Sequence, residues 1–271
     1  MPTFVFLCFH FSVSFLTSVK HFWLKLGLLF FASCLPALVG ADSAKVWEQA
    51  VWEQEAWEQV FDDSEQSITI YKRPLANGYS EFKGIATVQS TLSGCIALMR
   101  DVKAMPQWVD RTLQTVVLNR VSETEVYAYN VSRMDWPFKH RDAIVHIFVE
   151  QDPRTLAVTI RGSGVPTYSG PSRYDFKKNN NRYIRMPVIE SRWQFVPEPD
   201  GRVKVIFQGY GDPGGNTSAP IFKWLINRLA WEAPYNTLKA MKTVVQQEKY
   251  QRASFDFILD VNNTGIANNN K

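Results

Sequence analysis

Four titratable side chains fall within or beside predicted strands, where they could act as general acids or bases: Arg141, Asp142, His146 and Glu190. Such catalysis needs an acid and a base within hydrogen-bond reach of one reacting group, and nothing in the spacing of these residues assigns the two roles. His146 lies between apolar neighbours, which favours a histidine that is hydrogen bonded in a core or at a surface over a catalytic one. We therefore expect no catalytic residue and keep an enzyme as the alternative.

Sequence motifs for nucleophilic, metal-dependent and nucleotide chemistry are missing. The sequence contains no Gly-x-Ser-x-Gly nucleophile elbow and no paired-histidine metal motif. The glycine-rich stretch 211–215 lacks the lysine of a phosphate-binding loop, and we interpret it as a hinge before a helix. We expect neither a metal nor a cofactor.

Charge and cysteine content narrow the class of protein further. The chain carries 30 Lys and Arg against 26 Asp and Glu, a formal net charge of +4, and its basic residues are scattered. Nucleic-acid-binding domains carry a basic cluster instead, so no nucleic acid partner is expected. Cys95 is the only cysteine after residue 41, which leaves the rest of the chain without an intramolecular disulfide. Its stability must come from packing.

The first 41 residues have the pattern of an export signal. Residues 22–41 place Lys25 before an apolar run and end in Val39-Gly40-Ala41, a small-residue site of the kind that signal peptidase cleaves. We expect 1–41 to be a signal peptide and the protein to be secreted, into the periplasm or outside the cell. The alternative is a membrane anchor, because residues 4–19 are apolar too and a span needs about 20 such residues.

A five-residue repeat opens the expected mature chain. It places Trp47, Trp52 and Trp57 at a spacing that spirals around a helix and matches neither one face nor a heptad. We predict a helix over 44–61 that docks on the domain partly through these tryptophans. A helix lying on a membrane surface is the alternative.

Alternation of apolar and polar residues predicts eight strands. A hairpin over 67–73 and 81–89 is followed by helices over 91–102 and 105–108, and six strands then follow without an intervening helix. Tight turns join most of them, so consecutive strands should pair antiparallel. The long connection 162–182 is rich in Gly, Ser, Pro and Asn. The six strands are predicted over 115–121, 125–133, 143–150, 156–161, 183–196 and 202–210.

A long helix should close the domain. Pro220 marks its start, and an apolar stripe that includes Ile221, Leu225 and Leu229 continues toward Tyr250, with a kink at Pro234. Residues 251–271 form a polar, Asn-rich tail. The order of elements predicts an α+β domain over 42–250, in which a curved antiparallel sheet wraps around the C-terminal helix.

Such a sheet encloses an apolar cavity unless side chains fill it, and cavities of this kind bind hydrophobic ligands. Strand alternation and the helix stripe select the side chains expected to point to its inside. The predicted cavity wall consists of Tyr129, Ile147, Trp193, Phe207, Leu225 and Leu229.

The connection between two central strands carries a distinctive turn. Trp136 and Pro137 should shape it, and Arg141 could pair with Asp142 or with a neighbouring carboxylate. The segment 134–142 resembles the W-P-x-x-x-R-D turn of the StAR-related lipid-transfer (START) family. Segment 219–229, which reads APIFKWLINRL, is similar to the P-x-W-L-x-N opening of that family's C-terminal helix. The resemblance covers about residues 45–250.

This resemblance implies the helix-grip fold and a carrier for one hydrophobic ligand, most simply a lipid. It also implies that the strand from Asp142 lines the cavity, and Ile147 stands where some sterol-binding members place an arginine. We expect a monomer that touches membranes transiently while it exchanges its ligand. The alternative is a cyclase-like enzyme of the same superfamily, acting on a polyketide or a similar apolar substrate.

Overall fold

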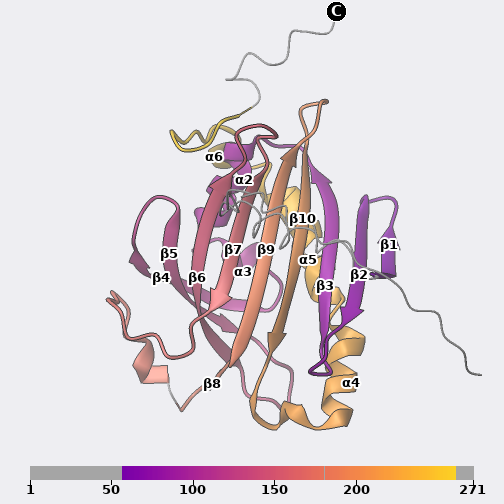
Figure 1. Cartoon of the computed structure of the whole chain (residues 1–271), viewed down its shortest axis with the longest axis vertical. Helices are drawn as coiled ribbons and strands as arrows, with labels where there is room; N and C mark the ends of the chain where they lie inside the picture. The colour runs from indigo at the N-terminus through magenta and orange to yellow at the C-terminus, as the bar shows by residue number, and fades with distance from the viewer. Residues whose placement is uncertain (1–56, 180, 261–271) are drawn as a thin grey trace, which may run out of the picture. The chain divides into compact units, whose positions relative to one another are not determined.

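The computed structural model describes residues 57–179 and 181–260 of the 271-residue chain (Figure 1). The predicted signal peptide lies outside the described residues, as do Trp47 and Trp52 of the predicted N-terminal helix. Within the described ranges, no helix combines the length and the apolar character needed to cross a membrane.

One large antiparallel sheet organises this part of the chain. Its order is β1-β2-β3-β10-β9-β7-β6-β5-β4, and the short β8 pairs parallel with β6. The predicted runs of alternating residues are confirmed as strands, except that the strand predicted over 183–196 is divided into β8 and β9. Strands β4 to β7, β9 and β10 form the predicted meander. The strands are β1 Glu58–Asp63, β2 Ile68–Pro74, β3 Ser80–Val88, β4 Thr112–Arg120, β5 Glu125–Ser132, β6 Arg141–Gln151, β7 Val158–Gly164, β8 Ile184–Arg185, β9 Val188–Pro197 and β10 Val203–Asp212.

The predicted helix over 44–61 is wrong at residues 57–61, the part of it that the structure describes. Residues 58–63 form β1, which adds an edge strand to β2. An edge strand has unpaired backbone groups, and pairing with β1 satisfies those of β2 on that side. The side chain of Phe61 stacks on Trp231, with ring centroids 4.5 Å apart, and Trp57 lies under the cations of Arg73 and Lys83. Of the three tryptophans predicted to dock this segment, Trp57 contacts the sheet, and it does so just before a strand and not on a helix.

Two helices follow the first hairpin as predicted. The Thr91 hydroxyl caps α2 (Leu92–Arg100) by accepting a hydrogen bond of 2.9 Å from the amide of Gly94. The short α3 (Met105–Trp108) begins with Pro106 in its first turn, where a missing amide hydrogen costs nothing.

The predicted long C-terminal helix is divided into three helices. These are α4 (Pro220–Leu229), α5 (Glu232–Val244) and α6 (Glu248–Gln251), and η2 (Gly215–Ser218) precedes them. The first break falls at Ala230-Trp231 and not at Pro234. Pro234 lies in the first turn of α5, where helix amides have no intrahelical acceptor, so it fits there without a kink.

The main core lies between α5 and one face of the sheet, here called the inner face; the other is the outer face. In Figure 1 α5 lies behind the sheet, against β2 and β3. Gly84 permits this close approach, because a Cβ there would lie 2.6 Å from Leu238 Cδ1 and 3.1 Å from Ile70 Cδ1. Leu238 and Met241 of α5 are completely buried.

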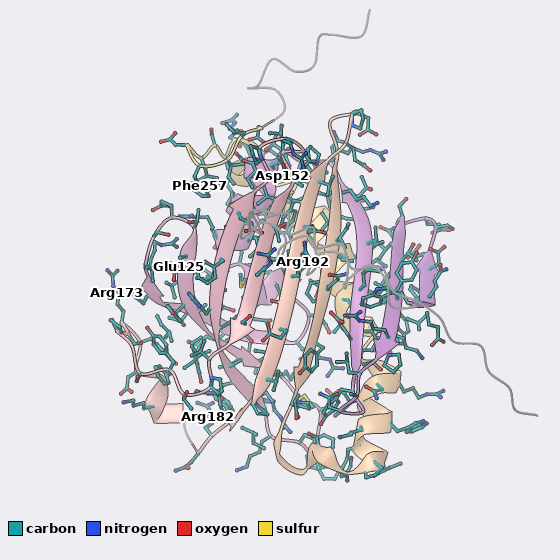
Figure 2. All side chains as sticks on the ribbon, viewed as in Figure 1. Glu125, Asp152, Arg173, Arg182, Arg192 and Phe257 are labelled. Atoms are coloured by element: carbon teal, nitrogen blue, oxygen red, sulfur yellow. The ribbon has the colours of Figure 1, made fainter. Side chains whose placement is uncertain are left out.

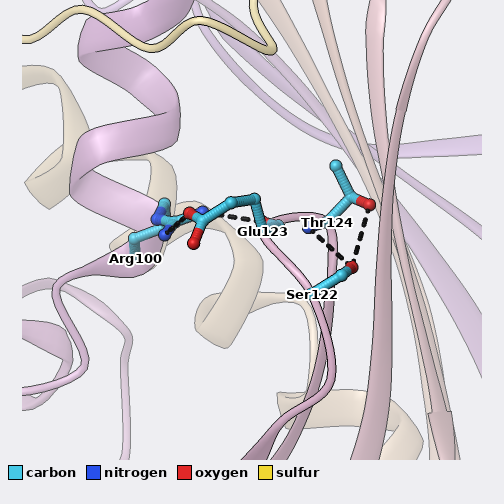
Figure 3. Close-up of polar contacts among 4 residues, drawn as sticks. All are labelled: Arg100, Ser122, Glu123 and Thr124. Atoms are coloured by element: carbon cyan, nitrogen blue, oxygen red, sulfur yellow. Dashed lines mark hydrogen bonds and ion pairs between the residues drawn. The ribbon is translucent and has the colours of Figure 1, made fainter.

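Contacts continue beyond residue 250, the end of the domain expected from sequence. Ile258 is buried in the main core, and the Asp260 carboxylate accepts a hydrogen bond from the amide of Ser93. Arg100 lies over the rings of Phe255 and Phe257 and also donates two hydrogen bonds to Glu123 in the β4–β5 turn (Figure 3). The segment after α6 therefore packs on α2.

Candidate ligand-binding site

Three of the predicted wall residues share the inner face. Trp193 on β9 is paired with Phe207 on β10, and the centroids of their rings are 4.5 Å apart. The alternation of β6 directs Ile147 to the same face, where it packs against the main core. Ile147, Trp193 and Phe207 therefore point to the same face of the sheet, as predicted, and their place in a cavity wall stays a prediction.

Tyr129 points to the outer face of the sheet, so it does not lie beside Ile147, Trp193 and Phe207. It is paired with Ile144, and Ile144 points opposite to Ile147 because neighbouring odd and even positions of a strand alternate between faces. Its ring is fully buried on the outer face, among Phe176, Tyr174 and Leu118. The prediction that Tyr129 shares a wall with Trp193 is wrong, because the register across the 133–140 connection cannot be read from alternation alone.

The two cavity-wall residues predicted on the C-terminal helix, Leu225 and Leu229, lie in α4. Their side chains are outside the described part of the structure, so their place in the cavity wall stays a prediction.

Burial changes along the inner face. At one end Val158, Phe195 and Val205 are completely buried. In the middle of this face and on β10 toward α4, Val145, Ile147 and Phe207 keep part of their surface exposed, whereas Ala143 and Arg141, further along β6, are buried again. Apolar side chains that face the helices and still have accessible surface must border space that neither the sheet nor α5 fills.

Arg141 connects the turn after β5 to the start of the C-terminal helices. It is 1% exposed, and its guanidinium donates to the carbonyl oxygens of Pro213 (2.8 Å), Gly214 (3.1 Å) and Lys139. Burial lowers its pKa from the usual arginine value. The sequence suggested a carboxylate partner, but every hydrogen bond described for this side chain goes to a backbone carbonyl. Arg141 thus fixes the glycine-rich lead-in of α4.

Asp142 fixes the long loop on the outer face. Its carboxylate accepts two hydrogen bonds from Arg185, of 3.0 and 2.9 Å, and a third of 2.9 Å from the hydroxyl of Tyr129. Arg185 also donates to the carbonyl of Pro166. Sequence reasoning missed Arg185, which lies 43 residues from its partner.

The outer face also holds the other acid–base candidates. His146 Nε2 lies 2.8 Å from Glu125 Oε1, and its ring stacks on Tyr127 at 4.1 Å. Glu190 accepts a hydrogen bond of 2.6 Å from the hydroxyl of Ser163. Figure 2 shows Arg192, two residues along from Glu190, on the side of β9 away from α5. His146 is thus a hydrogen-bonded surface histidine, one of the roles expected from its neighbours.

Helix α4 is attached to the rest of the domain by polar contacts and one aromatic contact. The side chain of Asn227 accepts from the amide of Ser80 (2.9 Å) and donates to the carbonyl of Gly78 (3.0 Å). Lys223 donates to the carbonyl of Asn77 (2.8 Å). The ring of Phe222 meets that of Phe138 edge to face at 5.1 Å. The two segments that resemble START motifs, 134–142 and 219–229, therefore touch each other.

Large apolar side chains are exposed on these same two segments. Trp136 is 93% exposed, Ile221 63% and Trp224 56%. The peptide bond between Trp136 and Pro137 is cis. The guanidinium of Arg228 lies over the ring of Trp224 at 5.6 Å. Sequence reasoning assigned Trp136 to shaping the turn, but its ring projects into solvent.

A pocket of about 460 Å³ lies between α3 and α5. Its lining includes Trp108, Val109, Arg111, Arg133, Asn236 and Ala240. Arg111 has a positive φ of 59°, which is uncommon for a residue with a side chain. No sequence pattern pointed to this pocket, because its residues come from three separate elements.

The comparisons with known proteins agree with this architecture. No family model matches the chain. An uncharacterized protein of Pseudomonas aeruginosa, PA1579, is 24% identical over 184 residues, which are 68% of this chain and 84% of that protein. A STAR-related lipid transfer protein from Xanthomonas axonopodis superposes with a TM-score of 0.61 and 27% identity, over 71% of this chain and 100% of that chain.

Human STARD10 superposes equally well, with a TM-score of 0.61 and 15% identity over 78% of this chain and 82% of that chain. The chain therefore has the α+β helix-grip fold of START domains, as its two motifs indicated.

Proposed function

We propose that this protein carries one hydrophobic ligand, a lipid, in an apolar cavity between the inner face of the sheet and its C-terminal helices. The observation that carries the proposal is the change in burial along the inner face, where Val145, Ile147 and Phe207 face the helices without being fully buried. Removing apolar ligand surface from water contributes about 25 cal/mol per Å². Burial alone can therefore drive binding, without a catalytic group. The protein from Xanthomonas axonopodis that shares this fold is named a STAR-related lipid transfer protein.

The ligand enters where α4 closes the sheet. Gly214 and Gly215, both with positive φ, precede this helix, and a break at Ala230-Trp231 follows it. The long connection 162–182 is the other candidate opening. Its aromatic residues pack on the outer face against Tyr127 and Tyr129, away from the proposed cavity.

The exposed side chains of Trp136, Ile221 and Trp224 touch the membrane during exchange. Tryptophan favours the interface between lipid and water, where its ring is half in an apolar medium. Lys223 and Arg228 on the same helix would favour anionic lipids over neutral ones.

Export is a further part of the proposal, based on residues 22–41 alone, with membrane anchoring as the alternative. Sequencing the N-terminus of the protein from its native host would show cleavage after Ala41 if the proposal is right.

The function is tested by native mass spectrometry and by transfer between vesicles. Native mass spectra of the purified protein should show one bound lipid per chain, and a fluorescent lipid should move between donor and acceptor vesicles faster with the protein than without it.

Replacing Trp136 and Trp224 by Ser should slow transfer while leaving binding in solution intact. Val121→Ser is the matched control, since Val121 is 51% exposed at the remote β4–β5 turn. A protein that neither holds nor moves a lipid would refute the proposal.

A further inference from the structure

Trp57, where the described structure begins, lies on the outer face of the sheet. The centroid of its ring is 4.8 Å from Cζ of Arg73 on β2 and 4.4 Å from Nζ of Lys83 on β3. Lys83 points to the outer face because its neighbour Gly84 faces α5. The edge strand β1 begins one residue later and lies beyond β2. Trp57 therefore brings the end of the preceding segment onto the outer face.

A row of cations crosses the outer face from this point. Lys83 is paired with Gln208 on β10, which is paired with Arg192 on β9. Arg192 is paired in turn with Arg161 on β7. Residues paired across neighbouring strands point to the same face, so Lys83, Arg192 and Arg161 lie along one line on four adjacent strands.

Two of these cations are directly opposite one another. Like charges in this arrangement destabilise a sheet. Arg161 has a carboxylate beside it, since its guanidinium lies 2.8 Å from Glu150. Arg192 is partly buried, although α5 packs on the other face of the sheet. An aromatic ring or a carboxylate over the row would stabilise it by cation–π contact or by charge attraction.

The five residues before Trp57 have the composition that fits this row. Residues 52–56 read WEQEA, which is one aromatic ring and two carboxylates without a cation. The letters WEQ occur again at 57–59. In that second copy the tryptophan ring lies over two cations, and Glu58 lies 3.3 Å from Lys72. The first copy carries the same groups for the same kind of contact.

The spacing of the two tryptophans matches the spacing of the row. Neighbouring strands are about 4.8 Å apart, so Arg192 lies about 10 Å and Arg161 about 14 Å from Lys83. Five residues span about 7.5 Å in a helix and about 16 Å when extended. With Trp57 on Lys83, Trp52 reaches toward Arg192 in the first conformation and toward Arg161 in the second.

We infer that residues 52–56 dock on the cation row of the outer face, with the ring of Trp52 over Arg192 and the carboxylates of Glu53 and Glu55 beside the row. The occupant is the chain's own segment. Its acidic character disfavours a helix on a membrane surface, because such helices carry Lys and Arg on their polar face. The row lies on the face opposite the proposed cavity, so this docking is independent of ligand binding.

Photo-cross-linking locates the segment. With p-benzoylphenylalanine in place of Trp52, irradiation of the full chain should give a main product of monomer mass, cross-linked to peptides from β7, β9 or β10. The same probe in place of Trp136, which is 93% exposed, is the matched control and should not label these strands. A product of dimer mass would assign the row to a second copy. That result, cross-links to added phosphatidylglycerol vesicles, or the absence of a product with these strands would each overturn the inference.

Oxidation by N-bromosuccinimide tests the role of the cations. Mass spectrometry of peptides should show Trp52 modified about five times more slowly than Trp136. Arg192→Glu should reduce this difference to less than about twofold, whereas Arg173→Glu, on the loop at the side of the sheet in Figure 2, should preserve it. Trp108 is 2% exposed, so its continued protection shows that each variant is folded. Equal rates for Trp52 and Trp136 in the wild-type chain, or protection of Trp52 that survives in folded Arg192→Glu, would overturn the inference.

Discussion

Helices α4 and α5 follow one another in the chain but are held in different ways. Helix α5 lies so close to β3 that no side chain fits at Gly84, and its residues Leu238 and Met241 are completely buried. Helix α4 is held by the hydrogen bonds of Asn227 and Lys223 with a hairpin turn and by the contact of Phe222 with Phe138, and Ile221 and Trp224 remain exposed. Among the described side chains, complete apolar burial fixes the first helix, and a few polar contacts with one aromatic contact position the second.

The difference indicates which helix can move. Separating α5 from the sheet would expose a large apolar area at about 25 cal/mol per Å². Of the contacts described for α4, separating it from the hairpin exchanges a few hydrogen bonds for bonds to water, each with a net value of about 1 kcal/mol. An opening motion should therefore displace α4 between Gly214-Gly215 and Ala230-Trp231, while α5 stays in place.

The largest expected effect comes from a pair of matched truncations, one on each helix. Leu238→Ala should lower the free energy of unfolding by about 2–5 kcal/mol, because it leaves a cavity in a fully buried site. Ile221→Ala should change it by less than about 0.5 kcal/mol, because this side chain is 63% exposed. Urea unfolding measures both. Similar losses for the two variants would contradict the distinction between the helices.

The next effect concerns Arg141, which fixes the lead-in of α4. Arg141→Met removes the donors to the carbonyls of Pro213 and Gly214 and should cost about 1–3 kcal/mol, because buried carbonyls are left without partners. Hydrogen exchange should rise most in residues 212–219. Arg161→Met serves as control, since the ion pair of Arg161 with Glu150 is half exposed and should contribute little. Unchanged exchange in 212–219 would assign Arg141 a role other than holding the hinge.

A smaller effect on stability should follow from Asn227→Ala. The variant loses both hydrogen bonds to the β2–β3 turn; one is part-buried and the other exposed, so each lies at the lower end of the usual range and together they should cost about 1 kcal/mol. The same energy would favour the open form by a factor of about five, so a bound fluorescent lipid should dissociate several times faster into an excess of unlabelled lipid. Val121→Ser, at the remote β4–β5 turn, is the control. Equal dissociation rates in Asn227→Ala and Val121→Ser would mean that α4 does not gate release.

Local patterns predicted the elements, because alternation and helical periodicity follow from which side chains are buried. The strands from β2 onward and the helices α2 and α3 were visible in this way, although β8 and β9 were predicted as one strand over 183–196. Two other features were not visible. β1 begins within a repeat whose period is typical of neither strand nor helix, and the break between α4 and α5 falls at Ala230-Trp231, where no helix-breaking residue stands.

Relations between distant residues could not be predicted. The pairing of β3 with β10 joins segments that are more than 100 residues apart, and the face of Tyr129 depends on the register of the β5–β6 pair. The partners of Arg141 are carbonyl oxygens, which every residue possesses, so no side-chain pattern identifies them. An irregular glycine-rich segment does leave carbonyls without sheet or helix partners, and this is the signal that a nearby buried arginine could have been matched to.

In the smallest expected effect, the reactivity of Cys95 does not change. This tests whether the tightly packed core stays closed while α4 opens. Cys95 on α2 is completely buried in the main core, and burial raises the pKa of its thiol to about 12. Thiolate is the reactive form, so at pH 8 alkylation should be slow in the native protein and fast in urea. If only α4 moves, Asn227→Ala should release lipid faster and still leave the alkylation rate of Cys95 unchanged.

The same thiol predicts a dependence of stability on pH. The unfolded chain releases its proton near the ordinary value of 9.0, and the folded chain near 12. The unfolded state therefore binds fewer protons between these values, so the contribution of Cys95 is fully present below pH 9 and is lost progressively as the pH rises toward 12. Cys95→Ala should flatten this part of the stability curve, because alanine has no proton to lose. If Cys95 became reactive in step with lipid release, α2 and the core around it would have to open together with α4, and the two helices would not differ as their contacts indicate.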